Sequence, residues 1–125
     1  MIVDTNALSA ILDGEPTIAA VFERADVLAI PVITLGEYRF GISQSTRRAE
    51  HEKSLQRNLP LYQVLAITEE TSEHYAQLRL ALKRAGTPIP SNDLWIAALC
   101  LQHDFPVLSK DRHFDRVKGL RRVEW

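Results

Sequence analysis

The chain alternates between short apolar runs and longer stretches in which apolar residues recur every three to four positions. The apolar runs have the length and composition of β-strands and lie at Met1–Val3, Val27–Ile30, Leu61–Ile67, Pro106–Leu108 and Leu120–Val123. The periodic stretches predict helices at Asn6–Leu12, Pro16–Arg24, Leu35–Ser43, Arg47–Asn58, Glu69–Arg84 and Asp93–Gln102. Strands that alternate with helices predict an α/β fold of three layers, with a central, mostly parallel sheet and helices on both faces. No repeat or linker interrupts the pattern, so residues 1–125 are expected to form a single domain.

Two helix starts carry local signals. Thr68 resembles an N-cap, and Glu69 and Glu70 favour the positive end of the helix that follows. Ser91 or Asn92 is expected to cap the helix DLWIAALCLQ. This helix is apolar nearly all round, which predicts that it is buried against the sheet.

The composition places the chain in a broad class. The apolar content of 46% and the charged content of 25% are those of an ordinary globular protein. The longest apolar stretch, Leu94–Leu101, is far shorter than the ~20 residues that span a bilayer, so no membrane association is expected. The N-terminal MIVDTN shows no secretory signal. The single Cys100 excludes a disulfide scaffold and favours a reducing cytoplasm.

The net charge of −1 gives no overall reason to expect a nucleic-acid partner. Basic residues do gather near the C-terminus, at Lys110, Arg112, Arg116, Lys118, Arg121 and Arg122. Such a cluster can contact phosphates, or it can form an ordinary solvated surface strip.

Four acidic residues are candidates for a common site. Asp4 and Asp111 directly follow predicted strands, and ligands of α/β sheets bind beyond the carboxyl ends of strands. Glu37 and Asp93 lie at or near helix starts, which suits the same edge of the sheet. Clustered carboxylates repel one another unless a cation neutralises them, and oxygen ligands suit Mg²⁺ or Mn²⁺. A metal held there can assist chemistry at a phosphate.

Each acid also has a purely structural alternative. Asp4 can cap the following helix, and Glu37 stands three residues after Thr34, which is the spacing of a capping box. Asp93 suits the positive end of its helix, and Asp111 suits a turn. The spacing alone leaves these alternatives open.

Several segments together resemble a known family. They are MIVDTNALS at the start, VITLGEYRFGI at residues 32–42, IPSNDLWIAA at residues 89–98 and VLSKDRHFDRVKGLRRVEW at the end. In this order they resemble the PIN-domain ribonucleases, and specifically the VapC-type toxins of toxin–antitoxin pairs. The resemblance covers essentially the whole chain and implies a PIN-like fold.

The resemblance implies a function for each matching residue. The metal-binding and catalytic acids would be Asp4, Glu37, Asp93 and Asp111. Thr5, Asn6 and Ser109 would support the site by hydrogen bonds, and Asp115 would add an outer carboxylate. The implied activity is hydrolysis of RNA phosphodiester bonds with Mg²⁺ or Mn²⁺.

The resemblance also implies partners and a location. These are an RNA substrate, a small VapB-like antitoxin, a homodimer and a toxin–antitoxin hetero-oligomer, all in the cytoplasm. The family's antitoxin blocks the acidic pocket, and exposed apolar residues around Tyr38 or Phe40 would form its groove, unless the core buries them.

Two other classes of Mg²⁺-binding domain of similar size do not fit the sequence. A receiver domain needs an aspartate at the end of the third strand, where this chain has Thr68. A haloacid dehalogenase needs a second aspartate two residues after the first, and this chain has Asn6 two residues after Asp4. The four histidines are scattered, and a surface position is the preferred interpretation even for His113, two residues from Asp111. The alternatives that remain are a metal-binding module that sequesters RNA without cleaving it and a solitary housekeeping PIN nuclease.

Overall fold

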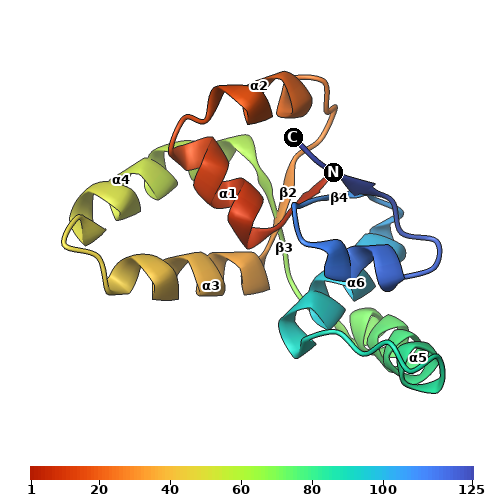
Figure 1. Ribbon diagram of the computed structural model, residues 1–125. Coiled ribbons are helices and arrows are strands. Elements are labelled where there is room, and N and C mark those ends of the chain that lie inside the picture. Colours follow the sequence, from red (N-terminus) through yellow and green to blue (C-terminus); the bar gives the residue numbers. More distant parts are fainter.

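A five-stranded sheet, parallel throughout, forms the middle layer of the protein. The computed structural model describes residues 1–125 (Figure 1). The elements in chain order are β1 (Ile2–Val3), α1 (Thr5–Leu12), α2 (Pro16–Phe22), β2 (Ala29–Pro31), α3 (Val32–Ser43), α4 (Arg48–Asn58), the 3₁₀ helix η1 (Leu59–Leu61), β3 (Gln63–Leu65), α5 (Glu69–Arg84), α6 (Ser91–His103), β4 (Val107–Leu108), the 3₁₀ helix η2 (Arg112–Arg116) and β5 (Arg122–Val123). The strand order is β3-β2-β1-β4-β5, so the direction in which strands are added reverses between β1 and β4.

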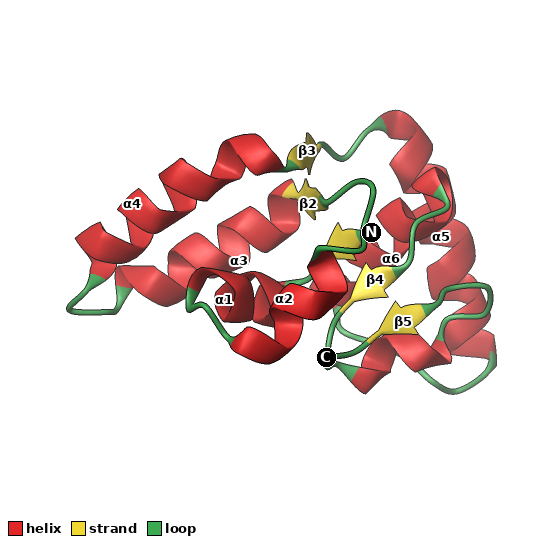
Figure 2. Ribbon diagram, turned by 90° about the horizontal axis from the view of Figure 1, so that it is seen from above, coloured by secondary structure: helices red, strands yellow, loops and turns green.

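Helices cover both faces of the sheet. Figures 1 and 2 show α1 to α4 on one side and α5 and α6 on the other. Successive strand residues point to opposite faces, so Ile2 and Val107 belong to the core under α5 and α6, whereas Val3 and Leu108 belong to the core under α1 to α4. The predicted three-layer α/β/α fold is confirmed, and residues 96–100 of α6 are buried as expected.

Several segments differ from the prediction: β2 lies at Ala29–Pro31, β5 starts only at Arg122, and α2 ends at Phe22. Helix α3 begins at Val32 rather than Leu35. Its first turn is held against β1, because the buried Thr34 hydroxyl donates a hydrogen bond to the Val3 carbonyl oxygen at 3.1 Å. The expected strand 61–67 is shortened to β3, because the Pro60-containing 3₁₀ helix η1 occupies its start. The short helix η2 was not predicted.

The two predicted helix caps have different outcomes. The Thr68 N-cap is confirmed, and the Thr71 hydroxyl accepts a hydrogen bond from the Thr68 amide at 3.0 Å. The prediction of Ser91 or Asn92 as the α6 N-cap was wrong, because the Pro90 carbonyl oxygen already accepts the first helical hydrogen bond, from Leu94. Asn92 is therefore inside the first turn of α6, with its side chain free for other contacts.

A bilayer-spanning helix is absent: none of the helices combines the required length with sufficient apolar character.

The 3₁₀ helix η2 is anchored by Phe114, whose side chain is fully buried in the core under α5 and α6. We expect Phe114→Ala to lower the free energy of unfolding by about 3–5 kcal/mol, because it removes an aromatic ring from a packed core. The matched control is Phe40→Ala, whose ring is 69% exposed and whose removal is expected to cost within about 0.5 kcal/mol. Urea denaturation monitored by circular dichroism measures both, and equal losses would contradict this account of η2.

Candidate metal centre

The carboxylate of Asp4 lies at the carboxyl end of β1 and is almost completely buried. Burial raises its pKa above the ordinary value, and the charge of Asp111 adds to this effect. Hydrogen bonds oppose the shift without cancelling it: the Ser109 hydroxyl donates to Asp4 Oδ2 at 2.7 Å, and Asn6 Nδ2 donates to the same oxygen at 3.1 Å. Asp4 is thus an acid that is held in place by neutral donors, with no cationic side chain beside it.

Ser109 and Asn6 join the end of β1 to the end of β4. Asn6 Nδ2 also lies 3.2 Å from the Ser109 hydroxyl, and the amide of Lys110 donates to Asn6 Oδ1 at 3.2 Å. The Ser109 hydroxyl in turn accepts a hydrogen bond from the amide of Asp111 at 2.9 Å. One buried hydroxyl therefore fixes the positions of both Asp4 and Asp111.

Glu37 projects from α3 and is half-buried. The capping-box alternative is excluded, because α3 has no side-chain cap and Thr34 bonds to β1 instead. Burial raises the pKa of Glu37, and the charge of Asp4 raises it further, while a hydrogen bond from Asn92 opposes both. Glu37 is therefore near Asp4, and it meets the first turn of α6 through Asn92.

The Thr5 hydroxyl is buried but makes no hydrogen bond of standard geometry with any protein group. It lies near the Glu37 carboxylate and slightly lowers its pKa. A buried polar atom without a partner normally costs free energy, so a ligand or an ion that supplies the partner would be favoured here.

Asp93 and Asp111 meet around a histidine. His113 Nδ1 lies 3.0 Å from Asp93 Oδ2 and 3.0 Å from Asp111 Oδ1. Ligand atoms of the three residues lie within 4.8 Å of one another, which is close enough for one metal ion. Burial raises the pKa of Asp93, and the charges of Asp4 and Asp111 raise it further, against the hydrogen bond from His113.

The four predicted acids form one electrostatically coupled group. The charge of Asp4 acts on Glu37 and Asp93, and that of Asp111 acts on Asp4 and Asp93. All four lie at the carboxyl edge of the sheet, next to the reversal between β1 and β4, where ligands of such folds bind. The raised pKa values, the unpartnered Thr5 hydroxyl and the oxygen donors fit a hard divalent cation.

Asp115 lies outside this group. Its exposed carboxylate forms a two-pronged ion pair with Arg122, with Nε–Oδ1 at 2.7 Å and Nη2–Oδ2 at 3.0 Å, and this pair lowers the pKa of Asp115. Arg122 Nη1 also donates to the Ser109 carbonyl oxygen at 3.1 Å. Asp115 thus touches the site only indirectly, by holding an arginine against the end of β4.

His113 is the residue that sequence reasoning undervalued. Its backbone amide donates to Asp111 Oδ1 at 2.9 Å, so Asp111 caps η2. This tight turn brings the imidazole back over the carboxylates. The signal in the sequence was Asp111 itself, because an aspartate side chain commonly accepts a hydrogen bond from the backbone amide two residues on, which here belongs to His113.

Comparisons with known proteins show the family of this chain. The model of the PIN domain matches residues 1–120. Ribonuclease VapC5 of Mycobacterium tuberculosis is 29% identical over 126 residues, which cover 98% of this chain and 91% of that protein. VapC ribonuclease Y4jK of Sinorhizobium fredii is 30% identical over 130 residues, which cover 96% of this chain and 93% of that protein.

Solved structures of VapBC complexes contain chains with the same fold as this protein. The toxin–antitoxin complex VapBC of Salmonella typhimurium, bound to DNA, contains a chain that superposes with a TM-score of 0.89 at 26% identity, over 99% of this chain and 96% of the other. VapBC2 of Rickettsia felis, bound to a DNA fragment of its promoter, gives a TM-score of 0.90 at 22% identity over 99% and 97%, which shows the common fold. The chain belongs to the PIN-domain family, among its VapC members.

Proposed function

We propose that this protein is a metal-dependent endoribonuclease and the toxin of a toxin–antitoxin pair. The observation that carries the proposal is the coupled group of Asp4, Glu37, Asp93 and Asp111, which lies at the ligand-binding edge of the sheet without a lysine or arginine to neutralise it. The names of the similar proteins support ribonuclease activity. We propose Mg²⁺ or Mn²⁺ as the metal and RNA as the substrate.

The position of each residue in the site suggests its role. Asp4, Asp93 and Asp111 would hold the metal, since they surround the ends of β1 and β4 and the start of α6. Glu37 faces them from α3 and would orient the attacking water and accept its proton. Asn6 and Ser109 would keep the carboxylate of Asp4 in its orientation, and the Thr5 hydroxyl would find its missing partner in the same pocket. Bound metal would supply stabilisation for the negative charge that develops on the phosphate.

The partner of the toxin would be a small VapB-like antitoxin, in a hetero-oligomer built on a homodimer in the cytoplasm. Supporting this, solved neighbours of the fold are VapBC complexes. A hollow of about 620 Å³ also lies beside the acids, lined by Glu37 and by the exposed side chains of Val32 and Phe40. An apolar rim next to unneutralised carboxylates suits a partner segment that carries both apolar residues and an arginine.

The first prediction tests the acids. We expect Asp4→Asn and Asp93→Asn each to slow RNA cleavage in Mg²⁺ roughly 100-fold or more, because each removes a charge that holds the metal. The matched control is Asp104→Asn, at the opposite end of α6, where the left-handed backbone (φ 55°) tolerates asparagine. Cleavage of a fluorescent RNA by purified protein is the measurement. Parent-like cleavage by both acid variants would contradict the metal-nuclease proposal, and a parent that binds RNA without cleaving it would favour the RNA-sequestering alternative.

The second prediction concerns stability. The pKa of Asp4 is raised in the folded protein, so ionisation costs stability as the pH rises through that value, and the cost is absent at lower pH. Metal-free Asp4→Asn at neutral pH is therefore expected to melt at or above the parent temperature. Mn²⁺ at about a hundredfold over its Kd should stabilise the parent by about 2.7 kcal/mol and leave Asp4→Asn almost unchanged. Thermal unfolding with and without Mn²⁺ checks both, and a destabilised metal-free variant would contradict the reasoning.

The third prediction concerns His113. Since its Nδ1 contacts both Asp93 and Asp111, His113→Ala should weaken Mn²⁺ binding about 10- to 100-fold, as expected for a residue that orients metal ligands. Calorimetric titration with Mn²⁺ measures this effect. His103→Ala, an exposed histidine at the far end of α6, is the control and should bind Mn²⁺ as the parent does. Parent-like binding by His113→Ala would show that the imidazole is only a surface neighbour.

The fourth prediction concerns pH. The pKa values of Asp4, Glu37 and Asp93 are all raised, mainly by burial, so protons compete with the metal further into the neutral range than they do at exposed acids. Mn²⁺ affinity should therefore fall as the pH is lowered from neutrality, and the fall should begin at a higher pH than it does for exposed carboxylates. Calorimetry across this range is the measurement, and an affinity independent of pH would argue against carboxylate ligands with raised pKa values.

A further inference from the structure

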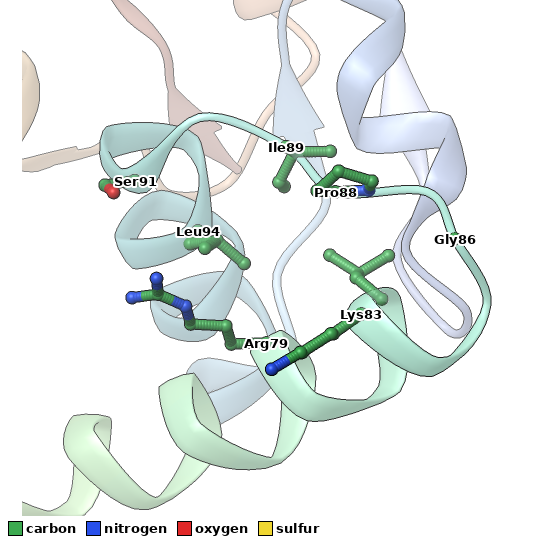
Figure 3. A pocket seen from close by; sticks show the side chains of 8 residues that line it. Arg79, Lys83, Gly86, Pro88, Ile89, Ser91 and Leu94 are labelled. Carbon is green, nitrogen blue, oxygen red and sulfur yellow. The ribbon is translucent and has the colours of Figure 1, made fainter.

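A second hollow, of about 500 Å³, lies between the end of α5 and the start of α6 (Figure 3). Its floor is apolar and consists of Leu82, Ile89 and Leu94. Its volume is within the ~300–1,000 Å³ that is usual for sites of small organic groups. The proposed active site does not use any of its lining residues.

The rim of this hollow carries a net positive charge. Arg79 and Lys83 stand one turn apart on α5; in Figure 3 the Arg79 side chain extends toward α6, whereas that of Lys83 runs along α5. Ser91 adds a hydroxyl at the first turn of α6, and none of the lining residues is acidic. Neither Arg79 nor Lys83 forms an ion pair within the protein. An apolar floor beneath two cations that have no ion-pair partner is complementary to a planar base that is attached to phosphates.

Aromatic side chains continue this surface along α5 and α6. Tyr75 and Trp95 stack with ring centroids 4.0 Å apart, and both are partly exposed. Arg79 Nη1 donates to the Tyr75 hydroxyl at 2.8 Å, and its guanidinium lies 5.9 Å from the centre of the Tyr75 ring. The arginine is thus held beside the hollow rather than free in solvent. Basic side chains interleaved with aromatic rings are typical of surfaces that bind single-stranded RNA.

The hollow is close to the proposed metal centre. Ser91 and Leu94, which line it, belong to the same helical turn of α6 as Asp93. The Arg116 side chain of η2 donates to the Pro88 carbonyl oxygen at 2.7 Å, so the helix that carries His113 is tied to the loop that carries Pro88 and Ile89. The hollow and the proposed metal centre thus share the first turn of α6.

We propose that this hollow is a nucleotide subsite for the RNA strand that is cleaved. A base next to the cleaved bond lies on Leu82, Ile89 and Leu94, and its phosphates pair with Arg79 and Lys83. This inference rests on the proposed ribonuclease function, and it adds the residues that hold the substrate outside the acidic centre.

The experiment compares two double variants that remove equal charge. Arg79→Gln/Lys83→Gln removes the cations of the hollow, and Lys53→Gln/Arg57→Gln removes two exposed cations from α4, away from the site. Binding of fluorescent single-stranded RNA is measured by anisotropy in Mg²⁺, with every protein also carrying Asp4→Asn so that the RNA stays intact. Cleavage by the same double variants with native Asp4 gives kcat and KM.

We expect the Arg79/Lys83 variant to bind RNA about tenfold or more weakly at ~0.1 M salt, and the slope of log affinity against log salt to fall by about 1.4, or ~0.7 for each lost phosphate contact. Its KM should rise with little change in kcat, whereas the α4 variant should resemble the parent. Unchanged melting temperature and Mn²⁺ binding would show that the fold and the metal centre are intact.

Two results would overturn the subsite. In the first, the Arg79/Lys83 variant has an RNA affinity and a KM within twofold of those of the α4 variant, while the parent still cleaves RNA. This result would contradict the subsite and leave the ribonuclease proposal standing. The other is a parent that neither binds nor cleaves RNA, which removes the ribonuclease proposal and the subsite with it.

Discussion

The buried carboxylate of Asp4 is the constraint on which the rest of the site depends. A carboxylate that loses its water is costly unless a charge or hydrogen bonds compensate for it, and Asp4 receives hydrogen bonds from Ser109 and Asn6 but no ion pair. The donors set its orientation, yet burial still raises its pKa. The chain therefore keeps an electrostatic cost that a lysine would have relieved, and a bound divalent cation is the simplest way to offset it.

The sheet places this carboxylate although its strands are only two or three residues long. The register pairs Val3 with Leu108, so the residues that follow, Asp4 and Ser109, are neighbours across the strands. A slip of one residue would place Lys110 beside Asp4 and would also turn the apolar side chains of β4 to the wrong faces. The two cores prevent this slip, because Val3 and Leu108 are fully buried in one of them and Ile2 and Val107 in the other. Packing of the core thus fixes the geometry of the hydrogen bonds at the site.

The sequence predicted the strands and most helices, because these depend on local pattern, whereas the grouping of the four acids came from the family resemblance and stays a prediction. It could not separate Glu37 from a capping role, since that required knowing that the Thr34 hydroxyl bonds to Val3, 31 residues earlier in the chain. It placed Asp115 among the supporting acids, whereas the side chain of Arg122 holds it elsewhere. It undervalued His113, because the turn at Asp111 is local but the contact that it allows, between the imidazole and Asp93, joins residues 20 positions apart. Tertiary contacts of this kind are not visible in hydrophobic periodicity.

Tertiary contacts also give three of the basic residues near the C-terminus a structural role. Arg122 is held by Asp115 and Glu124, and Arg116 donates to the Pro88 carbonyl oxygen. Lys110 lies 3.5 Å from a Glu15 carboxylate oxygen and 4.5 Å from the centre of the Trp125 ring. These three cations therefore brace the ends of β4 and β5 and the loop before α6.

An acidic centre on a chain with a net charge of −1 repels a polyanion until metal is bound, so attraction for RNA must come from cations that are free of such pairs. Arg112, Lys118 and Arg121 of the C-terminal cluster also form no ion pair. Arg79 and Lys83, however, line the hollow that shares the first turn of α6 with Asp93, which is why α5 is the better candidate for the surface that receives the substrate.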